Sequence, residues 1–219
     1  MKKALIVWGG WDGHTPKASV DVFAPLLAER GFEVMVSDKL DSYANKDLMA
    51  AQDLIIPCWT MAKIEGPQSK GLLDAVRAGA GIVGWHGGII DSFRENTEYQ
   101  WMTGGQWVAH PGNCIPSYKV AIVDPQHPIV KGLKDFTMPN TEQYYIHVDP
   151  GVHVLCNTVF TGEYGDADLY KAGTVMPYAY TKTWGKGKVF VACWGHTNKD
   201  FDVPEAREIV LRAMLWAAR

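Results

Sequence analysis

The sequence predicts a single α/β domain whose sheet is mostly parallel with antiparallel additions. In the first half of the chain, short apolar runs alternate with helical patterns, which is typical of βαβ units. The runs are continuously apolar, as expected of strands that are covered on both faces. The second half contains a hairpin signal at 185–188, where the sequence reads GKGK between two strand-like runs. No linker, repeat or low-complexity tract divides the chain, so residues 1–219 are assigned to one domain.

The first half predicts the parallel part of the sheet. The predicted strands are 4–8, 32–36, 54–58 and 81–85. Between them we expect helices from Pro16 to Gly31, around 48–50, and from Gly66 to Gly79. Pro67 suits the first turn of the third helix, and Gly79 suits its end.

The second half predicts the antiparallel additions. Its strand-like runs are 118–123, 152–156, 177–184 and 189–194. A last helix begins near Pro204, and its buried face is formed by Ile209, Leu211, Met214, Leu215 and Trp216.

Composition excludes some classes of partner. The formal net charge is -3 and no basic block is present, which argues against a nucleic-acid partner. The apolar run at 4–8 is too short for a signal peptide or a membrane span, so we expect a cytoplasmic protein without a membrane partner. The nine tryptophans and nine tyrosines suit a sugar-binding cleft or a large core, and exposed aromatics could form a homo-oligomer interface.

The four cysteines do not form a CxxC pair, which argues against a redox motif or a zinc ribbon. Three of them lie in apolar, strand-like runs. We interpret these cysteines as small buried hydrophobic residues in a reducing cytosol. The positions are Cys58, Cys114, Cys156 and Cys193.

Three histidines follow predicted strands. His14 comes after the first strand, His86 after the fourth, and His196 after the last. Ligands of open α/β sheets bind outside the carboxyl ends of the strands, so we expect these histidines to converge there. The alternative for each is a histidine in a surface loop.

The turn at 84–88, with the sequence GWHGG, has the pattern of a nucleophile elbow. Its central residue is His86, where an acyl-transfer enzyme would carry serine or cysteine. A histidine at this point could be a general acid, a general base or a metal ligand.

Two further segments carry candidate residues. His110 lies near Trp107, and Glu142 precedes Tyr144. Glu142 could be an acid–base partner or a ligand oxygen, or a solvated loop residue. The other histidines, at 127, 147 and 153, are expected to be structural or exposed. Histidine and glutamate suit zinc or manganese, but without an HxH or HxxxH spacing the sequence leaves a divalent metal open.

An ordered set of short motifs runs along almost the whole chain. The motifs are GWHGG at 84–88, GGQWVAHP at 104–111, HPI at 127–129, EQY at 142–144, GKGKVF at 185–190, GH at 195–196 and WA at 216–217. In this order they resemble the ThuA-like (trehalose utilization) family. The resemblance implies the class I glutamine-amidotransferase-like fold, a flavodoxin-like three-layer sandwich. It also implies bacterial use of trehalose and related disaccharides, alongside sugar dehydrogenases that make 3-keto sugars.

In class I amidotransferases the elbow holds a cysteine, and a histidine after a late strand completes the triad. By this resemblance, His86 stands at the elbow position and His196 at that of the late histidine. The missing cysteine at the elbow argues against glutaminase activity. We therefore expect an enzyme that acts on a disaccharide or keto-sugar by isomerisation, hydrolysis or elimination. His86 and His196 would be its acid–base pair, and Glu142 would orient a histidine, bind a hydroxyl or ligate a metal.

The remaining candidates would bind the sugar ligand. They are His14, His110, Tyr144 and the tryptophans Trp11, Trp107 and Trp194, which could stack on the sugar. Two alternatives remain open: a non-catalytic sugar-binding or regulatory module on an amidotransferase-like scaffold, and a metal-dependent hydrolase.

Overall fold

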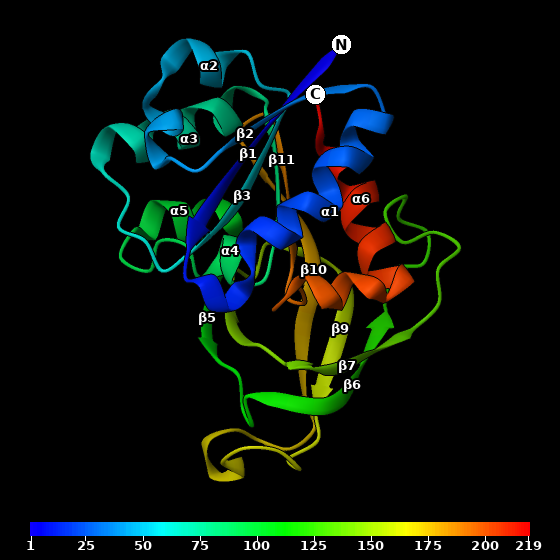
Figure 1. Ribbon diagram of the computed structural model, residues 1–219. Helices are drawn as coiled ribbons and strands as arrows, with labels where there is room; N and C mark the ends of the chain where they lie inside the picture. The colour runs from blue at the N-terminus through cyan, green and yellow to red at the C-terminus, as the bar shows by residue number, and fades with distance from the viewer.

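The computed structural model describes the backbone of residues 1–219 and every side chain except that of residue 167. Nine strands form one sheet in the order β2-β1-β3-β4-β11-β10-β9-β6-β7 (Figure 1). Their bounds are β1 Lys2–Gly10, β2 Phe32–Ser37, β3 Leu54–Thr60, β4 Gly81–Trp85, β6 Cys114–Ile122, β7 Phe136–Glu142, β9 His153–Phe160, β10 Thr174–Trp184 and β11 Gly187–Ala192. A separate antiparallel pair is formed by β5 (Gly105–Ala109) and β8 (Tyr145–Val148).

The strands β2, β1, β3, β4 and β11 are mutually parallel, so their carboxyl ends lie along the same edge of the sheet. Apart from the edge strand β2, their central residues, such as Leu5, Ile55 and Val83, are fully buried. Helices on both faces exclude water from these strands, which explains their continuous apolar runs. The predicted parallel sheet is confirmed.

Helices cover both faces of the parallel strands (Figure 1). Helices α1 and α6 contact each other on one face, and α2, α3 and α5 lie together on the other. Their bounds are α1 Pro16–Glu29, α2 Lys46–Ala50, α3 Gly66–Ala78, α5 Thr97–Thr103 and α6 Pro204–Ala217. The predicted three-layer sandwich is therefore confirmed, although α5 was not predicted.

The second half of the chain extends the sheet with antiparallel strands. β10 pairs with β11 through the predicted hairpin, and β9, β6 and β7 follow in turn. Strands β6 and β9 are longer than predicted, and β5, β7 and β8 were not predicted at all. β5 and β8 are short, and β7 carries Pro139 and Asn140, which are rare in strands. β7 is an edge strand, where a missing backbone N–H is tolerated.

Short 3₁₀ helices follow three of the parallel strands. They are η1 (Asp12–His14) after β1, η2 (Leu40–Ala44) after β2 and η4 (Asn198–Asp202) shortly after β11. A four-residue helix, α4 (Gly87–Ile90), follows β4. Among the described residues, no helix combines the length and the apolar character that crossing a membrane requires.

Candidate functional site

Four neighbouring parallel strands end at one cluster of polar side chains. His14 follows β1, Thr60 ends β3, His86 follows β4, and His196 comes shortly after β11. These strands are adjacent in the sheet, in the order β1-β3-β4-β11. The imidazole rings of His14 and His86 have centroids 4.7 Å apart, and that of His196 lies 5.2 Å from His14. The structure thus brings together the three histidines that the sequence places after strands.

His86 occupies a strained turn between β4 and α4. Its φ of 50° and ψ of -144° place it in a region that residues other than glycine rarely adopt. Such strain costs about 1–3 kcal/mol and is typical of functional sites. The backbone N–H of His86 donates to Ala192 O over 2.7 Å, which ties the turn to β11. The strand–turn–helix geometry of an elbow is therefore present, with histidine at its centre.

The glycine after His86 lets a second segment approach. A Cβ atom at Gly87 would lie 2.6 Å from Cε1 of His14, which is closer than side chains can pack. Glycine at this position therefore allows the His14 ring to sit against the elbow.

Both ring nitrogens of His86 are engaged. Nδ1 donates its hydrogen to Cys193 O over 2.8 Å, because a carbonyl oxygen can only accept. Nε2 lies 3.1 Å from Oε2 of Glu142. The ring also stacks on Tyr144 with a centroid distance of 3.7 Å, and His86 as a whole is only 1% exposed. The imidazole is therefore fixed in one orientation.

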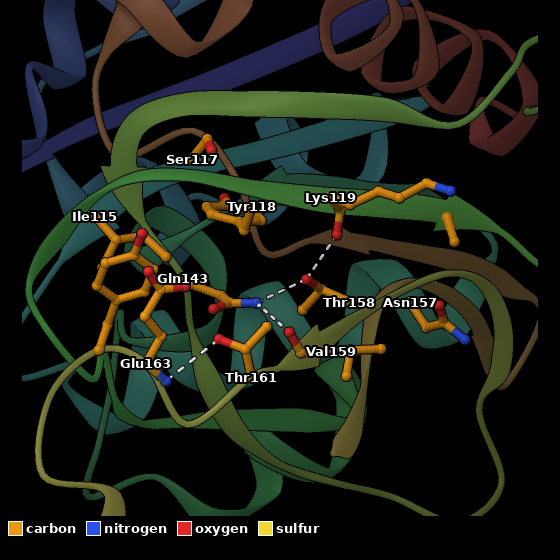
Figure 2. A pocket seen from close by; sticks show the side chains of 12 residues that line it. Ile115, Ser117, Tyr118, Lys119, Gln143, Asn157, Thr158, Val159, Thr161 and Glu163 are labelled. Carbon is orange, nitrogen blue, oxygen red and sulfur yellow. Dashed lines mark hydrogen bonds between the residues drawn. The ribbon is translucent and has the colours of Figure 1, made fainter. Parts of the chain in front are cut away.

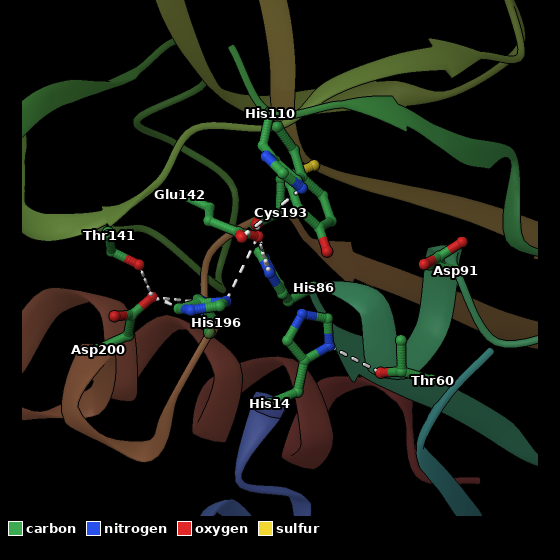
Figure 3. Close-up of polar contacts among 12 residues, drawn as sticks. His14, Thr60, His86, Asp91, His110, Thr141, Glu142, Cys193, His196 and Asp200 are labelled. Atoms are coloured by element: carbon green, nitrogen blue, oxygen red, sulfur yellow. Dashed lines mark hydrogen bonds and ion pairs between the residues drawn. The ribbon is translucent and has the colours of Figure 1, made fainter. Parts of the chain in front are cut away.

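The carboxylate of Glu142 is the common neighbour of three histidines (Figure 3). Besides His86, Nδ1 of His196 lies 3.3 Å from Oε2, and Nε2 of His110 lies 3.7 Å from Oε1. Burial alone would raise the pKa of Glu142, but its contacts with His196 and His86 outweigh burial and hold that pKa well below its usual range. Glu142 is therefore an anion in a largely buried site.

The backbone around Glu142 is held by buried hydroxyls. Tyr118 donates to Glu142 O over 3.0 Å, and Tyr178 donates to the Tyr118 hydroxyl over 2.9 Å. The Tyr178 hydroxyl in turn accepts the backbone N–H of Tyr144 over 3.2 Å. These bonds fix the end of β7, which carries the carboxylate, against β6 and β10.

The next residue, Gln143, anchors the same segment from its other side (Figure 2). Its amide donates to Thr158 Oγ1 over 2.7 Å, and Thr158 donates to Lys119 O over 2.8 Å. These residues line a cavity of about 300 Å³ on β6 and β9. Since these polar groups bond to one another, we assign this cavity a structural role.

The His14 ring is held by Thr60, whose Oγ1 lies 2.8 Å from Nδ1. Burial and the neighbouring histidines 86 and 196 lower the pKa of His14 to about 2. His14 is therefore a neutral imidazole at physiological pH. Figure 3 shows its second ring nitrogen directed toward His86 and Glu142.

Asp200, in η4, shapes the loop that carries His196. Its Oδ2 accepts the backbone N–H of Gly195 over 2.9 Å, that of His196 over 3.0 Å, and the hydroxyl of Thr141 over 2.9 Å. Asp200 thus connects the His196 loop to β7, next to Glu142.

Four of these side chains have the composition of a metal-binding group. One ligand atom from each of His14, His86, Glu142 and His196 lies within 4.8 Å of the other three. All but His196 are buried. Three imidazoles and one carboxylate form a common ligand set for zinc and other transition metals.

Comparison with known proteins identifies the family. Residues 3–217 match the family model ThuA, described as "Trehalose utilisation". The chain belongs to the ThuA family. No curated protein sequence matched.

Solved structures agree with the family's fold. A ThuA-like protein from Bacteroides uniformis ATCC 8492 superposes with a TM-score of 0.80 at 18% identity, covering 99% of this chain and 91% of that one. Another, from Parabacteroides merdae ATCC 43184, gives 0.77 at 17% identity, with 99% and 89% covered. A cytoplasmic protein from Salmonella typhimurium LT2 gives 0.68 at 11% identity, with 99% and 100% covered.

None of the four cysteines of this ThuA-family chain lies at the elbow, where a class I amidotransferase carries its cysteine. Cys58, Cys156 and Cys193 are buried, as expected from their strand-like runs. Burial raises the pKa of the Cys58 and Cys156 thiols to about 12 and that of Cys193 further still. Cys114 is exposed at the start of β6, and the pKa of its thiol is also raised by burial and by Glu142 and Asp200.

The remaining sequence-predicted residues divide between the site and the core. Trp11 packs against His14 with ring centroids 4.8 Å apart, and it is half exposed. Trp107 lies beside His110, with centroids 5.6 Å apart. Tyr144 belongs to the cluster, but its ring is buried under His86.

The expectation that Trp194 stacks on a ligand does not fit its position. Its side chain is fully buried, its indole N–H donates to Ala206 O over 3.2 Å, and its ring packs against Phe136. It follows a buried strand directly and continues into the core, so it presents no free face.

A groove of about 490 Å³ opens beside the cluster. His110 lies on both, since it lines the groove and also approaches Glu142. The aromatic side chains on the groove are Trp107, Tyr145 and Tyr170. His110 is therefore the residue that connects the buried cluster to an accessible surface.

Sequence reasoning missed two residues of the site, Thr60 and Asp200. Thr60 could have been found from its place at the carboxyl end of β3. Asp200 gave no signal, because its role depends on the fold of the loop between β11 and α6. The histidines at 127 and 153 lie together in a different place, with ring centroids 5.6 Å apart.

Proposed function

We propose that this chain is an enzyme that acts on a disaccharide or keto-sugar by acid–base chemistry at the cluster around Glu142, and that it is not a glutaminase. The observation that carries the proposal is the convergence of His86, His110 and His196 on one carboxylate, with His110 also on the groove. The family's description as trehalose utilisation supports a sugar as the substrate.

Burial divides the roles within the cluster. Both nitrogens of His86 are engaged, so the sequence-based pairing of His86 with His196 as acid and base is revised. We assign His86 to holding Glu142. The side chain of His110 is 30% exposed and that of His196 is 15% exposed, so these two are open to a ligand. His110 is the proposed proton carrier, because it also lines the groove.

A keto-sugar suits this arrangement chemically. The C–H bond next to a sugar carbonyl is acidic enough for a histidine to remove its proton, while a cationic or hydrogen-bonding group stabilises the resulting enolate oxygen. Isomerisation and elimination both begin with this step. Trp11 packs against His14 and Trp107 lies beside His110, and we assign both tryptophans to stacking on sugar rings.

The cellular context follows from the same chemistry. A 3-keto sugar is made by oxidation of a sugar hydroxyl, so a sugar dehydrogenase would supply the substrate. We propose a cytoplasmic location, which agrees with the description of the Salmonella protein.

A substrate panel tests the proposal. Trehalose, other disaccharides and their 3-keto derivatives are incubated with the wild type and with Glu142→Gln and His110→Gln, and products are followed by NMR. His153→Gln is the matched control, because His153 also pairs with a carboxylate, Asp124, but lies on the surface away from the cluster. We expect conversion of a keto-sugar by the wild type and the control, and its loss in both site variants. Conversion by all four proteins would contradict the proposal.

The aromatic groove also favours a second candidate, a non-catalytic sugar-binding module. Trp107, Tyr145 and Tyr170 could bind a sugar without any chemistry at Glu142. Sugar binding that is equal in the wild type and Glu142→Gln, with no conversion by either, would favour this candidate.

A further inference from the structure

We infer that His14, His86, His196 and Glu142 bind one divalent transition-metal ion, such as zinc or manganese. The inference concerns the same site as the proposed function and adds a cofactor to it. It rests on the direction in which each ring nitrogen points.

The orientation of His86 leaves a lone pair facing an anion. Its Nδ1 carries the hydrogen that is donated to Cys193 O, so in the neutral ring Nε2 has none. That bare nitrogen lies 3.1 Å from Oε2 of Glu142, which is also an acceptor. Two acceptors at this distance need a cation between them, which is either a second proton on the His86 ring or a metal ion.

His196 approaches the same oxygen from the loop after another strand. Its Nδ1 lies 3.3 Å from Oε2 of Glu142, without the alignment of a hydrogen bond. That nitrogen is buried and has no hydrogen-bond partner among the described residues. A buried polar atom without a partner is rare in native proteins and needs an explanation such as a bound ion.

His14 completes the set from the opposite side. Its Nδ1 is engaged by Thr60 Oγ1 over 2.8 Å, and its other nitrogen faces the centre (Figure 3). A single proton can bridge only two of these atoms. A metal ion satisfies all four ligands at once.

The dimensions suit a metal ion. The four ligand atoms lie within 4.8 Å of one another. In a tetrahedral site, metal–ligand bonds of about 2.0–2.2 Å place the ligand atoms about 3.3–3.6 Å from one another, so closure needs only a small inward rotation of the side chains. Nitrogen-rich sites select transition metals over magnesium and calcium, which prefer oxygen ligands.

The outer contacts are those of a metal site. Histidine ligands usually donate their second N–H to a carbonyl or another oxygen, which fixes the ring. Cys193 O does this for His86, and Thr60 Oγ1 does it for His14. His110 remains outside the four, on the groove side, where it can serve a substrate. A metal here would polarise a sugar carbonyl or hydroxyl.

Metal binding is measured directly, without substrate. Purified protein is stripped with a chelator, and Zn²⁺ and Mn²⁺ are then titrated by calorimetry. Co²⁺ is added separately, and its visible absorption reports nitrogen coordination. We expect about one equivalent of metal per chain. His14→Ala should weaken binding by at least about 100-fold, and Thr60→Val by about 10- to 100-fold.

Controls separate lost ligands from lost folding. His153→Ala removes a surface histidine paired with a carboxylate and should bind metal as the wild type does. Circular dichroism of each variant shows whether it folds, and the cobalt spectrum of the wild type needs no variant at all. Absence of binding by the folded wild type, or equal binding by His14→Ala, would overturn the inference.

Metal binding and sugar conversion are measured separately, so either can fail without the other. A chain that binds metal through these residues but converts no sugar would uphold the metal site and contradict the enzyme. A chain that converts a keto-sugar but binds no metal would uphold the enzyme and contradict the metal site.

Discussion

Oε2 of Glu142 lies 3.1 Å from Nε2 of His86, whose other nitrogen already donates to the carbonyl of Cys193. This relationship joins the edge strand β7 to the elbow after β4, although 56 residues separate the two positions. The site therefore depends on how the antiparallel half of the sheet returns to the carboxyl ends of the parallel strands.

Gly87→Ala should disturb the cluster through His14. The new methyl group would lie 2.6 Å from Cε1 of His14, so the ring or the elbow must move. We expect a loss of about 1–3 kcal/mol in the free energy of unfolding, as for other overpacked cores, measured by urea denaturation. Gly66→Ala is the control, because no atom lies near its Cβ position. Equal stability of the two variants would show that the elbow has more room than the structure indicates.

Tyr118→Phe should loosen the backbone that carries Glu142. The variant loses the hydrogen bond to Glu142 O, which is worth about 1 kcal/mol in the free energy of unfolding. Tyr43→Phe is a matched control, since the buried Tyr43 hydroxyl has no partner among the described residues. Its removal should be neutral or stabilising. Chemical denaturation of both variants makes the comparison, and a greater loss in Tyr43→Phe would contradict it.

Asp200→Asn should destabilise the loop that carries His196. Asp200 Oδ2 accepts from two backbone N–H groups and from Thr141, and the uncharged amide oxygen of asparagine is a weaker acceptor for these donors. We expect a loss of about 1–3 kcal/mol, seen as a lower midpoint in thermal unfolding. The neighbouring exposed Asp202 supplies the control variant Asp202→Asn. Equal midpoints for the two variants would show that this network does not hold the loop.

The pair of Asp149 and Lys182 should give a pH-dependent contribution to stability. The hydrogen bond from Lys182, followed by that from the backbone of Gly151, lowers the pKa of Asp149. The folded state therefore favours the carboxylate, and the contribution is present above the unfolded pKa of about 3.9 and lost as pH falls below it. At pH 7, Asp149→Asn should unfold at a temperature a few degrees lower than the wild type.

Thermal unfolding from neutral to acidic pH tests whether the contribution of Asp149 to stability falls with pH. The difference between the wild type and Asp149→Asn should shrink as the pH falls below about 4. Asp74→Asn, in an exposed pair with Lys70, should change the midpoint little at any pH. A difference that grows toward acidic pH would show the opposite linkage.

The parallel half of the fold could be predicted from the sequence because its signals are local. The apolar runs of β1, β3 and β4 and the glycines that end the helices are sufficient to predict alternating strands and helices. The rule that ligands bind at the carboxyl ends of such strands then brings His14, His86 and His196 together. That residues 1–219 fold as one domain stays a prediction, which a single unfolding transition would support.

The position of Glu142 could not be predicted in this way. It ends β7, an edge strand whose place in the sheet depends on pairing with β6. Trp194 was predicted to lie in the site because it follows a strand, but its side chain is buried in the core. Thr60 and Asp200 act through hydrogen bonds that exist only in the assembled fold.

The central claim is that the carboxylate of Glu142 and its histidines carry out proton transfer on a keto-sugar. The most direct measurement is the rate at which the hydrogen next to the carbonyl of a 3-keto disaccharide exchanges with deuterium from D₂O, followed by NMR. We predict exchange catalysed by the wild type, and a rate at least about 100-fold lower in a folded Glu142→Gln variant. Exchange at the same rate in both proteins would contradict the account.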